Sequence, residues 1–544
     1  QAIASDFLQT ELALSPETAS RLGLERALGP ATSFALNNHS QAGFERRRLV
    51  RIELLQRLRQ RPRLPEGHIL IDDLAIAERA LLDLISLEQF GYGRFNYCLM
   101  RPYAIDPYSG FWVDGPSLLA FRQSINTVDQ ASAFVMRLRS LSAALQDTRR
   151  RIIADETAGI RIPVSLRSET QKRLAVLADP NSGALDELFL TFNALTLGVP
   201  DLEPEDRDAL VAMVRQEIEQ NLRPSYAQLL DALSGANSES PDRLGMWAQP
   251  RGEELFVGTL NASTGDTVAI DRLHERHLQD ANDWHDRLRS LLAAPANEDQ
   301  TDQAIPEALS ARLTWFEAYY QDDTIPPVGT ADTAIPPESA LVALSPRPVW
   351  TAIGETSSFA AQSEAMTRLN GFWETQPYSA WRTGAENEQP SLRALVEYPA
   401  IVDAWRIYAW NAKAADDTLE HSLMDRAAIQ SIGLIQASLA ATDTGIHLER
   451  WTLENAIDFL ATHTGLSATL SEQLALRIAA RPGHQSATLV ALHRFEALSE
   501  RAKAVLGAQY SEAEFQRTLI RKGPRPLDMI DRDIEAWYGE RLGN

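Results

Sequence analysis

Apolar residues recur every three or four positions along most of this chain, which is the period of a helix with one buried face. Thr127 and Thr452 can cap two of these segments, and Ser15-Pro16 can open a further helix near the start of the chain. The segments with this pattern are 41–61, 71–90, 127–152, 204–234, 267–293, 424–442, 452–461 and 485–507. The pattern predicts a mainly α-helical protein.

The segment 235–265 departs from the helical period. Glycines interrupt it at regular intervals, and residues 254–260 (ELFVGTL) have the composition of a short strand. We therefore expect a small β element near residues 245–265.

The same pass along the chain indicates two helical regions that together form one compact unit. We place an N-terminal helical region at residues 1–235 and a C-terminal helical region, which holds the candidate site, at residues 236–544, with a cleft between them. The proline-rich stretch 321–348 is predicted to be a surface connector, and a cover over the cleft is the alternative.

Composition narrows the classes of partner. The 544 residues carry 52 basic and 74 acidic side chains, a net charge of −22, so nucleic acid is not expected as a partner. The sequence has no apolar run long enough to span a membrane as a helix. The single cysteine, Cys98, excludes an intrachain disulfide and a thiolate metal cluster, and we interpret it as a small buried apolar residue.

The chain begins with Gln1 instead of methionine. A secretion signal removed before Gln1 would account for this, so we expect a periplasmic or secreted protein, with a cytoplasmic one as the alternative.

Standard nucleotide-binding, serine-hydrolase and simple zinc-protease motifs are absent from the sequence. His274 and His277 share a helix face and could bind a metal, but their charged surroundings favour surface histidines. Asp443 and His447 flank Gly445, which we expect to break a helix before Thr452 begins the next one. An Asp beside a His can orient the imidazole for acid–base chemistry. The alternative is that Asp443 caps backbone amides and His447 packs beneath the turn.

Two further groups of residues are candidates for ligand binding. His484 follows the break at Arg481-Pro-Gly, near the start of a new helix. The aromatic residues between positions 371 and 410, which include Trp373, Trp405 and Tyr408, could line a ligand groove or fill the core.

Several short motifs occur in the order typical of one bacterial family. They are LSPETA at 14–19, IDPYSG at 105–110, LGMW at 244–247, DTGIH at 443–447, WTLENA at 451–456, RPG at 481–483 and GPRPL at 523–527. In these motifs the chain resembles domain-of-unknown-function family 885, whose members look like helical zinc metallopeptidases. The resemblance covers essentially the whole chain and implies a large helical fold of the zincin-like metallopeptidase type.

The zinc-binding motif of that family is degenerate here. Active-looking members carry a His-Glu-x-x-Pro-Gly-His-His motif upstream of a Glu-Gly-Trp-Ala-Leu-Tyr segment. In this chain Asp403, Trp405 and Tyr408 resemble the second segment, while Glu374 and Pro377 match the first. The positions of the family's histidines hold Trp373, Ser379 and Ala380.

No histidine occurs between His285 and His421, so no other alignment restores the motif. Because a catalytic zinc needs about three protein ligands, the sequence predicts neither a metal nor another cofactor.

Three functional hypotheses follow from the family resemblance and from the loss of the family's zinc motif in this chain. The first is a metal-free pseudopeptidase that binds a peptide or a protein in its cleft. The second is a metal-independent enzyme in which Asp443 and His447 act as acid and base, with Glu374 or Asp403 as a second carboxylate. The third is an active zinc peptidase with replacement ligands such as His421, His447 or His484. The oligomeric state stays open.

Overall fold

The computed structural model describes residues 2–21, 31–65, 68, 70–97, 100–123, 125–234, 242–293, 395–396, 398–414 and 423–542. These residues are mainly helical, as the apolar pattern predicted. Within them, no helix is both long enough and apolar enough to cross a bilayer. Cys98, Trp373, Glu374, His421 and the stretch 321–348 lie outside the described residues.

The first part of the chain supplies a layer of helices, and its second helix begins at Pro16, where the predicted start signal stands. Its members are α1 (Ala2–Leu14), α2 (Pro16–Arg21), α4 (Ala31–Phe34), α5 (Gln41–Arg59) and α6 (Leu70–Glu88). They are followed by a two-residue antiparallel ladder of β1 (Arg94–Phe95) and β2 (Met100–Arg101).

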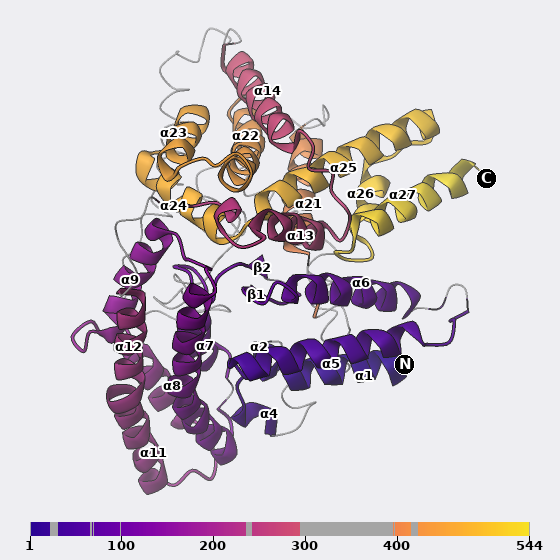
Figure 1. Cartoon of the computed structure of the whole chain (residues 1–544). Helices are drawn as coiled ribbons and strands as arrows, with labels where there is room; N and C mark the ends of the chain where they lie inside the picture. Colours follow the sequence, from indigo (N-terminus) through magenta and orange to yellow (C-terminus); the bar gives the residue numbers. More distant parts are fainter. Residues whose placement is uncertain are drawn as a thin grey trace.

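The middle of the chain forms a lobe with a core of its own (Figure 1). It consists of α7 (Phe111–Phe121), α8 (Val128–Thr157), α9 (Val164–Ala178), α10 (Asp186–Thr196), α11 (Pro204–Glu217) and α12 (Arg223–Ser234), with a π-helical turn at Ile218–Leu222. Its buried apolar side chains come from residues 104–233. Thr127 caps α8, as its sequence predicted, because its side-chain oxygen accepts a hydrogen bond from the amide of Gln130.

The second core joins the first helices of the chain to the last ones. It is built by α1, α5 and α6 together with α13 (Gly252–Thr264), α14 (Leu273–Ala293), α21 (Pro399–Ala414), α22 (Leu423–His447), α23 (Leu453–Thr464), α24 (Ala468–Ala480), α25 (His484–Leu506), α26 (Glu512–Ile520) and α27 (Leu527–Leu542). In Figure 1 these C-terminal helices gather above α5 and α6. Thr452, predicted as a cap residue, caps α23, and it forms a capping box with Asn455.

The prediction of a β element near 245–265 is wrong. This segment contains a short 3₁₀ turn at Met246–Ala248 and then α13. Glu253 and Glu254 in the first turn of α13 favour a helix start, and Leu255, Phe256 and Leu260 are buried at helical spacing.

The glycine at position 252 has a packing role in this segment. A Cβ at Gly252 would lie 1.7 Å from the carbonyl oxygen of Met246, so the tight approach of turn and helix requires glycine there. Within the described residues, the β-sheet is formed by β1 and β2, and residues 245–265 take no part in it.

The helix break expected at Gly445 is also absent. Helix α22 continues through Gly445 to His447. A Cβ at this position would lie 2.4 Å from the indole of Trp451, so the glycine lets Trp451 pack directly on the last turn of α22. The boundary proposed at residues 235/236 falls in 235–241, outside the described residues, and the division into two regions stays a prediction.

Candidate functional site

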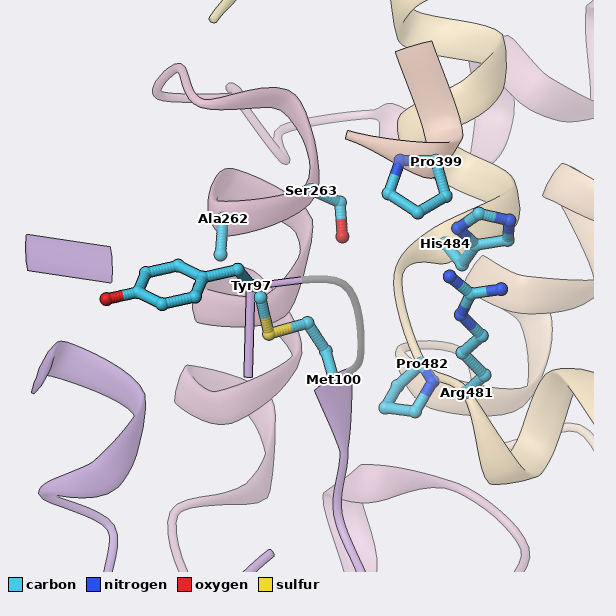
Figure 2. Close-up of a pocket in the computed structure, with 8 residues that line it drawn as sticks. All are labelled: Tyr97, Met100, Ala262, Ser263, Pro399, Arg481, Pro482 and His484. Carbon is cyan, nitrogen blue, oxygen red and sulfur yellow. The ribbon is translucent and has the colours of Figure 1, made fainter. Parts of the chain in front are cut away.

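A small pocket lies where four segments from distant parts of the sequence meet (Figure 2). Its wall is formed by Tyr97, Met100, Ala262, Ser263, Pro399, Arg481, Pro482 and His484. The space open to the centres of water-sized molecules is about 20 Å³, which admits a small polar group or one to two waters. The turn between α24 and α25 supplies three of these residues, including a histidine and an arginine.

His484 pairs with Asp403 beside this pocket. Nε2 of His484, the first residue of α25, lies 3.3 Å from Oδ2 of Asp403 on α21, and both side chains are buried. Burial, together with the charges of Arg481 and Arg101, lowers the pKa of His484 to about 4, against the raising effect of Asp403. The imidazole is therefore neutral near pH 7.

Asp443 on α22 holds the beginning of α25. Its Oδ1 accepts a hydrogen bond from the amide of Gly483, and its Oδ2 accepts two, from the amide and the hydroxyl of Ser486. Burial raises the pKa of this carboxyl to about 6, against the lowering effect of these hydrogen bonds. The carboxylate thus satisfies amides that the first turn of α25 leaves without helical partners.

His447 is held by the main chain on both sides of its ring. The amide of Met246 donates to Nδ1 at 3.1 Å, and Nε2 lies 3.3 Å from the carbonyl oxygen of Ile478. Since Nδ1 accepts a hydrogen bond, the proton of the neutral ring lies on Nε2 and points to that carbonyl. Burial lowers the pKa of His447 to about 4. Its Nε2 is 3.7 Å from Oδ1 of Asp443, beyond hydrogen-bond distance.

Trp405 and Tyr408 lie in the core beside the site and do not line the pocket. The hydroxyl of Tyr408 donates to Oε1 of Glu512 at 3.0 Å, and its ring packs near Phe495 and Phe515. Burial raises the pKa of Tyr408 above its ordinary range. Of the predicted ligand-binding residues, the structure brings Asp403 and His484 together.

The expectation that His274 and His277 lie on the surface is wrong for His277. This side chain is buried against α22, with Nδ1 3.1 Å from the carbonyl oxygen of Ala440. His274 is partly buried and contacts the hydroxyl of Thr444 at 2.9 Å. Each imidazole thus contacts a different turn of α22.

The described residues do not fit a zinc site. Across the ranges that the structure describes, no three His, Cys, Asp or Glu side chains are grouped so that they could hold a metal ion. Asp403 and His484 form a pair, and both nitrogens of His447 face main-chain groups.

Sequence reasoning did not find Tyr97, Met100, Ala262, Ser263 or Pro399 as pocket residues. These side chains have no chemical signature at sequence level, and only packing brings them to the turn at 481–484. Arg481 carried a signal, because it belongs to the RPG motif.

The fold and the site define a mainly helical protein in which a buried Asp–His pair and an arginine adjoin a small pocket. The chain belongs to the family described as "Bacterial protein of unknown function (DUF885)", whose model matches residues 16–332 and 381–534. No curated protein matches the sequence.

Two solved structures share this fold. One is described as "the putative lipoprotein from Colwellia psychrerythraea", with a TM-score of 0.78 and 18% identity over 99% of each chain. The other is described as "a putative lipoprotein of unknown function from Shewanella oneidensis", with a TM-score of 0.64 and 13% identity over 97% of this chain and 98% of the other.

Proposed function

We propose that this chain is a metal-free member of its family that binds a peptide or a protein segment at the pocket beside His484. A location outside the cytoplasm is part of this proposal. It is supported by the two structures of similar fold, whose descriptions call them lipoproteins. The proposal combines the altered zinc motif of the sequence with the geometry around α25.

The proposal rests on a difference between two Asp–His combinations, Asp443 with His447 and Asp403 with His484, in what their polar atoms contact. Asp443 and His447 direct their polar atoms to amides and carbonyls that join α22, α25 and the turn at Met246. Asp403 and His484 instead adjoin a pocket built from several segments. We infer a structural role for the first set and a ligand-binding role for the second.

The same geometry disfavours the two alternatives. Acid–base chemistry by Asp443 and His447 would require both side chains, which are fully buried, to give up their main-chain partners. A replacement zinc site at His447 and His484 would require the ring of His447 to release Met246 or Ile478. Each rearrangement leaves a buried main-chain group without a partner, at a cost of about 1–3 kcal/mol.

The first test is the metal content of protein purified without chelator, by elemental mass spectrometry, together with a calorimetric titration with zinc. We expect far less than one zinc per chain and no saturable heat. About one zinc per chain that is lost in His484→Ala or His447→Ala would contradict the metal-free proposal.

The second test addresses binding. A tryptic digest of casein serves as the peptide probe, and peptides that co-elute with the protein in gel filtration are measured by mass spectrometry. Ser263→Trp, which fills the pocket, should abolish co-elution. Ser234→Trp is the matched control, because Ser234 is an exposed helical serine whose hydroxyl also bonds to the carbonyl four residues earlier. Co-elution that Ser263→Trp leaves unchanged would place binding elsewhere.

A further inference from the structure

Helix α10 has apolar residues on the face that it exposes as well as on the face that it buries. Its buried face includes Leu188 and Phe192. On the other side, Leu190, Ala194 and Leu197 recur at helical spacing and are exposed, Leu190 by 55% and Leu197 by 71%. A helix that is apolar all round is normally buried on every side, so an exposed outer face of this kind needs an explanation.

The exposed face is continuous and carries no charge. Residues 188–200 (LFLTFNALTLGVP) contain no charged side chain, although 23% of the whole chain is charged. Leu197, which directly follows α10, keeps helical backbone angles (φ −64°, ψ −28°) and so continues the face beyond the last turn. Leu195, 42% exposed, lies beside it. A contiguous exposed apolar face is typical of a surface that binds a partner, whereas single exposed leucines are not.

Carboxylates border this face at both ends. Residues 186–217, which span α10 and α11, contain eight acidic and two basic side chains, a net charge of −6. Asp186 begins α10, and Asp201, Glu203, Glu205 and Asp206 lie between the exposed leucines and the first turn of α11. All five are exposed, and none of them forms an ion pair with a described residue.

Side-chain contacts hold the acidic segment against α10. Nη2 of Arg207 donates to Oδ1 of Asn193 at 2.7 Å, and Nη1 of Arg207 lies 3.0 Å from Asp208. Because Asn193 adjoins the exposed face of α10, the start of α11 lies beside that face. The other basic residue, Arg215, places its guanidinium carbon 4.3 Å from the ring centre of Phe189. The apolar face therefore has a mainly acidic border.

We propose that the exposed face of α10 binds an amphipathic segment of a partner protein. The partner supplies an apolar stripe for the leucines and lysine or arginine residues for the acidic border. The sign of the border decides between possible occupants, because a second copy of this chain would bring a border of the same sign and an anionic membrane surface would be repelled.

This surface is separate from the pocket beside His484, since none of its residues line that pocket. In Figure 1, α11 lies at the end of the middle lobe away from the C-terminal helices that form the pocket. The inference therefore goes beyond the proposed function and does not depend on it.

Fluorescence anisotropy with synthetic peptides tests the inference. The probe is the amphipathic peptide LKKLLKLLKKLLKL with fluorescein at its N-terminus. One control peptide has glutamate in place of every lysine, and another has the same composition in an order without helical period. We expect the lysine peptide to bind about tenfold or more tightly than either control, and its affinity to fall as the salt concentration rises.

Variants at exposed positions locate the binding. Leu190→Gln should weaken binding of the lysine peptide about tenfold, because it places an amide in the apolar face. Leu49→Gln on α5 is the matched control, since Leu49 is 57% exposed on another helix. Glu205→Gln should weaken binding and reduce its salt dependence, whereas Glu253→Gln, at an exposed position in the first turn of α13, should do neither.

Equal binding of the lysine and glutamate peptides overturns the inference, and so does a loss of affinity that is the same in Leu190→Gln and Leu49→Gln. Sedimentation velocity and flotation with phosphatidylglycerol vesicles test the other occupants. Self-association or vesicle binding that Leu190→Gln abolishes would assign the face to a second copy or to a membrane, and would also overturn the inference. The pocket variant Ser263→Trp should leave binding of the lysine peptide unchanged, and its loss there would place that binding at the pocket.

Discussion

Asp443 and Ser486 are joined by two hydrogen bonds, because Oδ2 of Asp443 accepts from both the amide (3.0 Å) and the hydroxyl (2.8 Å) of Ser486. The two residues lie on α22 and α25. The carboxylate therefore acts as a helix cap supplied by another helix, and it fixes the turn that carries Arg481 and His484.

Asp443→Ala should destabilise the protein by about 2 kcal/mol or more, because it removes the cap and leaves the amides of Gly483 and Ser486 buried without a partner. Ser486→Ala removes the hydroxyl alone and should cost about 1 kcal/mol. Urea-unfolding midpoints of the two variants provide the measurement. Equal effects would mean that the amide hydrogen bonds contribute nothing.

The buried His447 makes stability depend on pH. Its pKa is about 4 in the folded protein, below the ordinary value of 6.5. The unfolded chain therefore binds more protons between these values, and the stability that neutral His447 provides is lost as the pH falls from about 6.5 to 4.

Asp443, whose raised pKa of about 6 acts in the opposite direction, is present in wild type and variant alike. The comparison of His447→Asn with wild type isolates the histidine. The destabilisation caused by His447→Asn should shrink by up to about 3 kcal/mol between pH 7 and pH 4. Gly445→Ala changes no titratable group and should have the same effect at each pH. A pH-independent effect of His447→Asn would show that the ring titrates alike in both states.

Gly445→Ala should destabilise the protein although alanine is the better helix former. The added methyl group would overlap the indole of Trp451, which must shift, at a cost of about 1–3 kcal/mol. Gly539→Ala in α27 meets no atom within 4 Å and should stabilise by about 0.5–1 kcal/mol. Thermal midpoints of the two variants should therefore move in opposite directions.

Arg51 joins three N-terminal helices through buried ion pairs. Nε and Nη2 donate to Glu11 at 3.1 Å each, and Nη1 donates to Glu88. Arg51→Met leaves two buried carboxylates without their cation and should cost about 3–5 kcal/mol. Arg501→Met breaks the exposed pair with Glu535 and should cost at most about 1 kcal/mol. Similar effects of both variants on chemical unfolding would contradict the burial argument.

The helices could be predicted because their buried faces repeat with the helical period. The same rule would have placed His277 correctly, since it lies between Leu273 and Ala281 at intervals of four, and all three are buried. Its charged neighbours in the sequence occupy the other faces of α14. The β prediction failed because the glycine at position 252 marks a close contact with the turn at Met246 instead of a strand boundary.

The site was predictable only in part. Asp403 and His484 carry motif signals, and the structure pairs them at 3.3 Å. Arg101 contacts Ala480, which lies 379 residues further along the sequence, and no local sequence pattern predicts such a contact. The assignment of polar atoms at Asp443 and His447 likewise depends on which main-chain groups tertiary packing brings to them.

Because the first and last helices share a core, the N-terminal helices cannot complete their packing until the C-terminal helices have been synthesised. Residues 104–233 bury their own apolar side chains and can do so as soon as they emerge. Helices α1, α5 and α6 must wait for partners near the other end; Lys522, for instance, bonds to Asp72 across 450 residues. At about 5–20 residues per second this delay is on the order of 20–90 seconds. During that time the earliest helices of the chain expose the apolar surface that the latest will cover, and exposed surface of this kind is prone to aggregation.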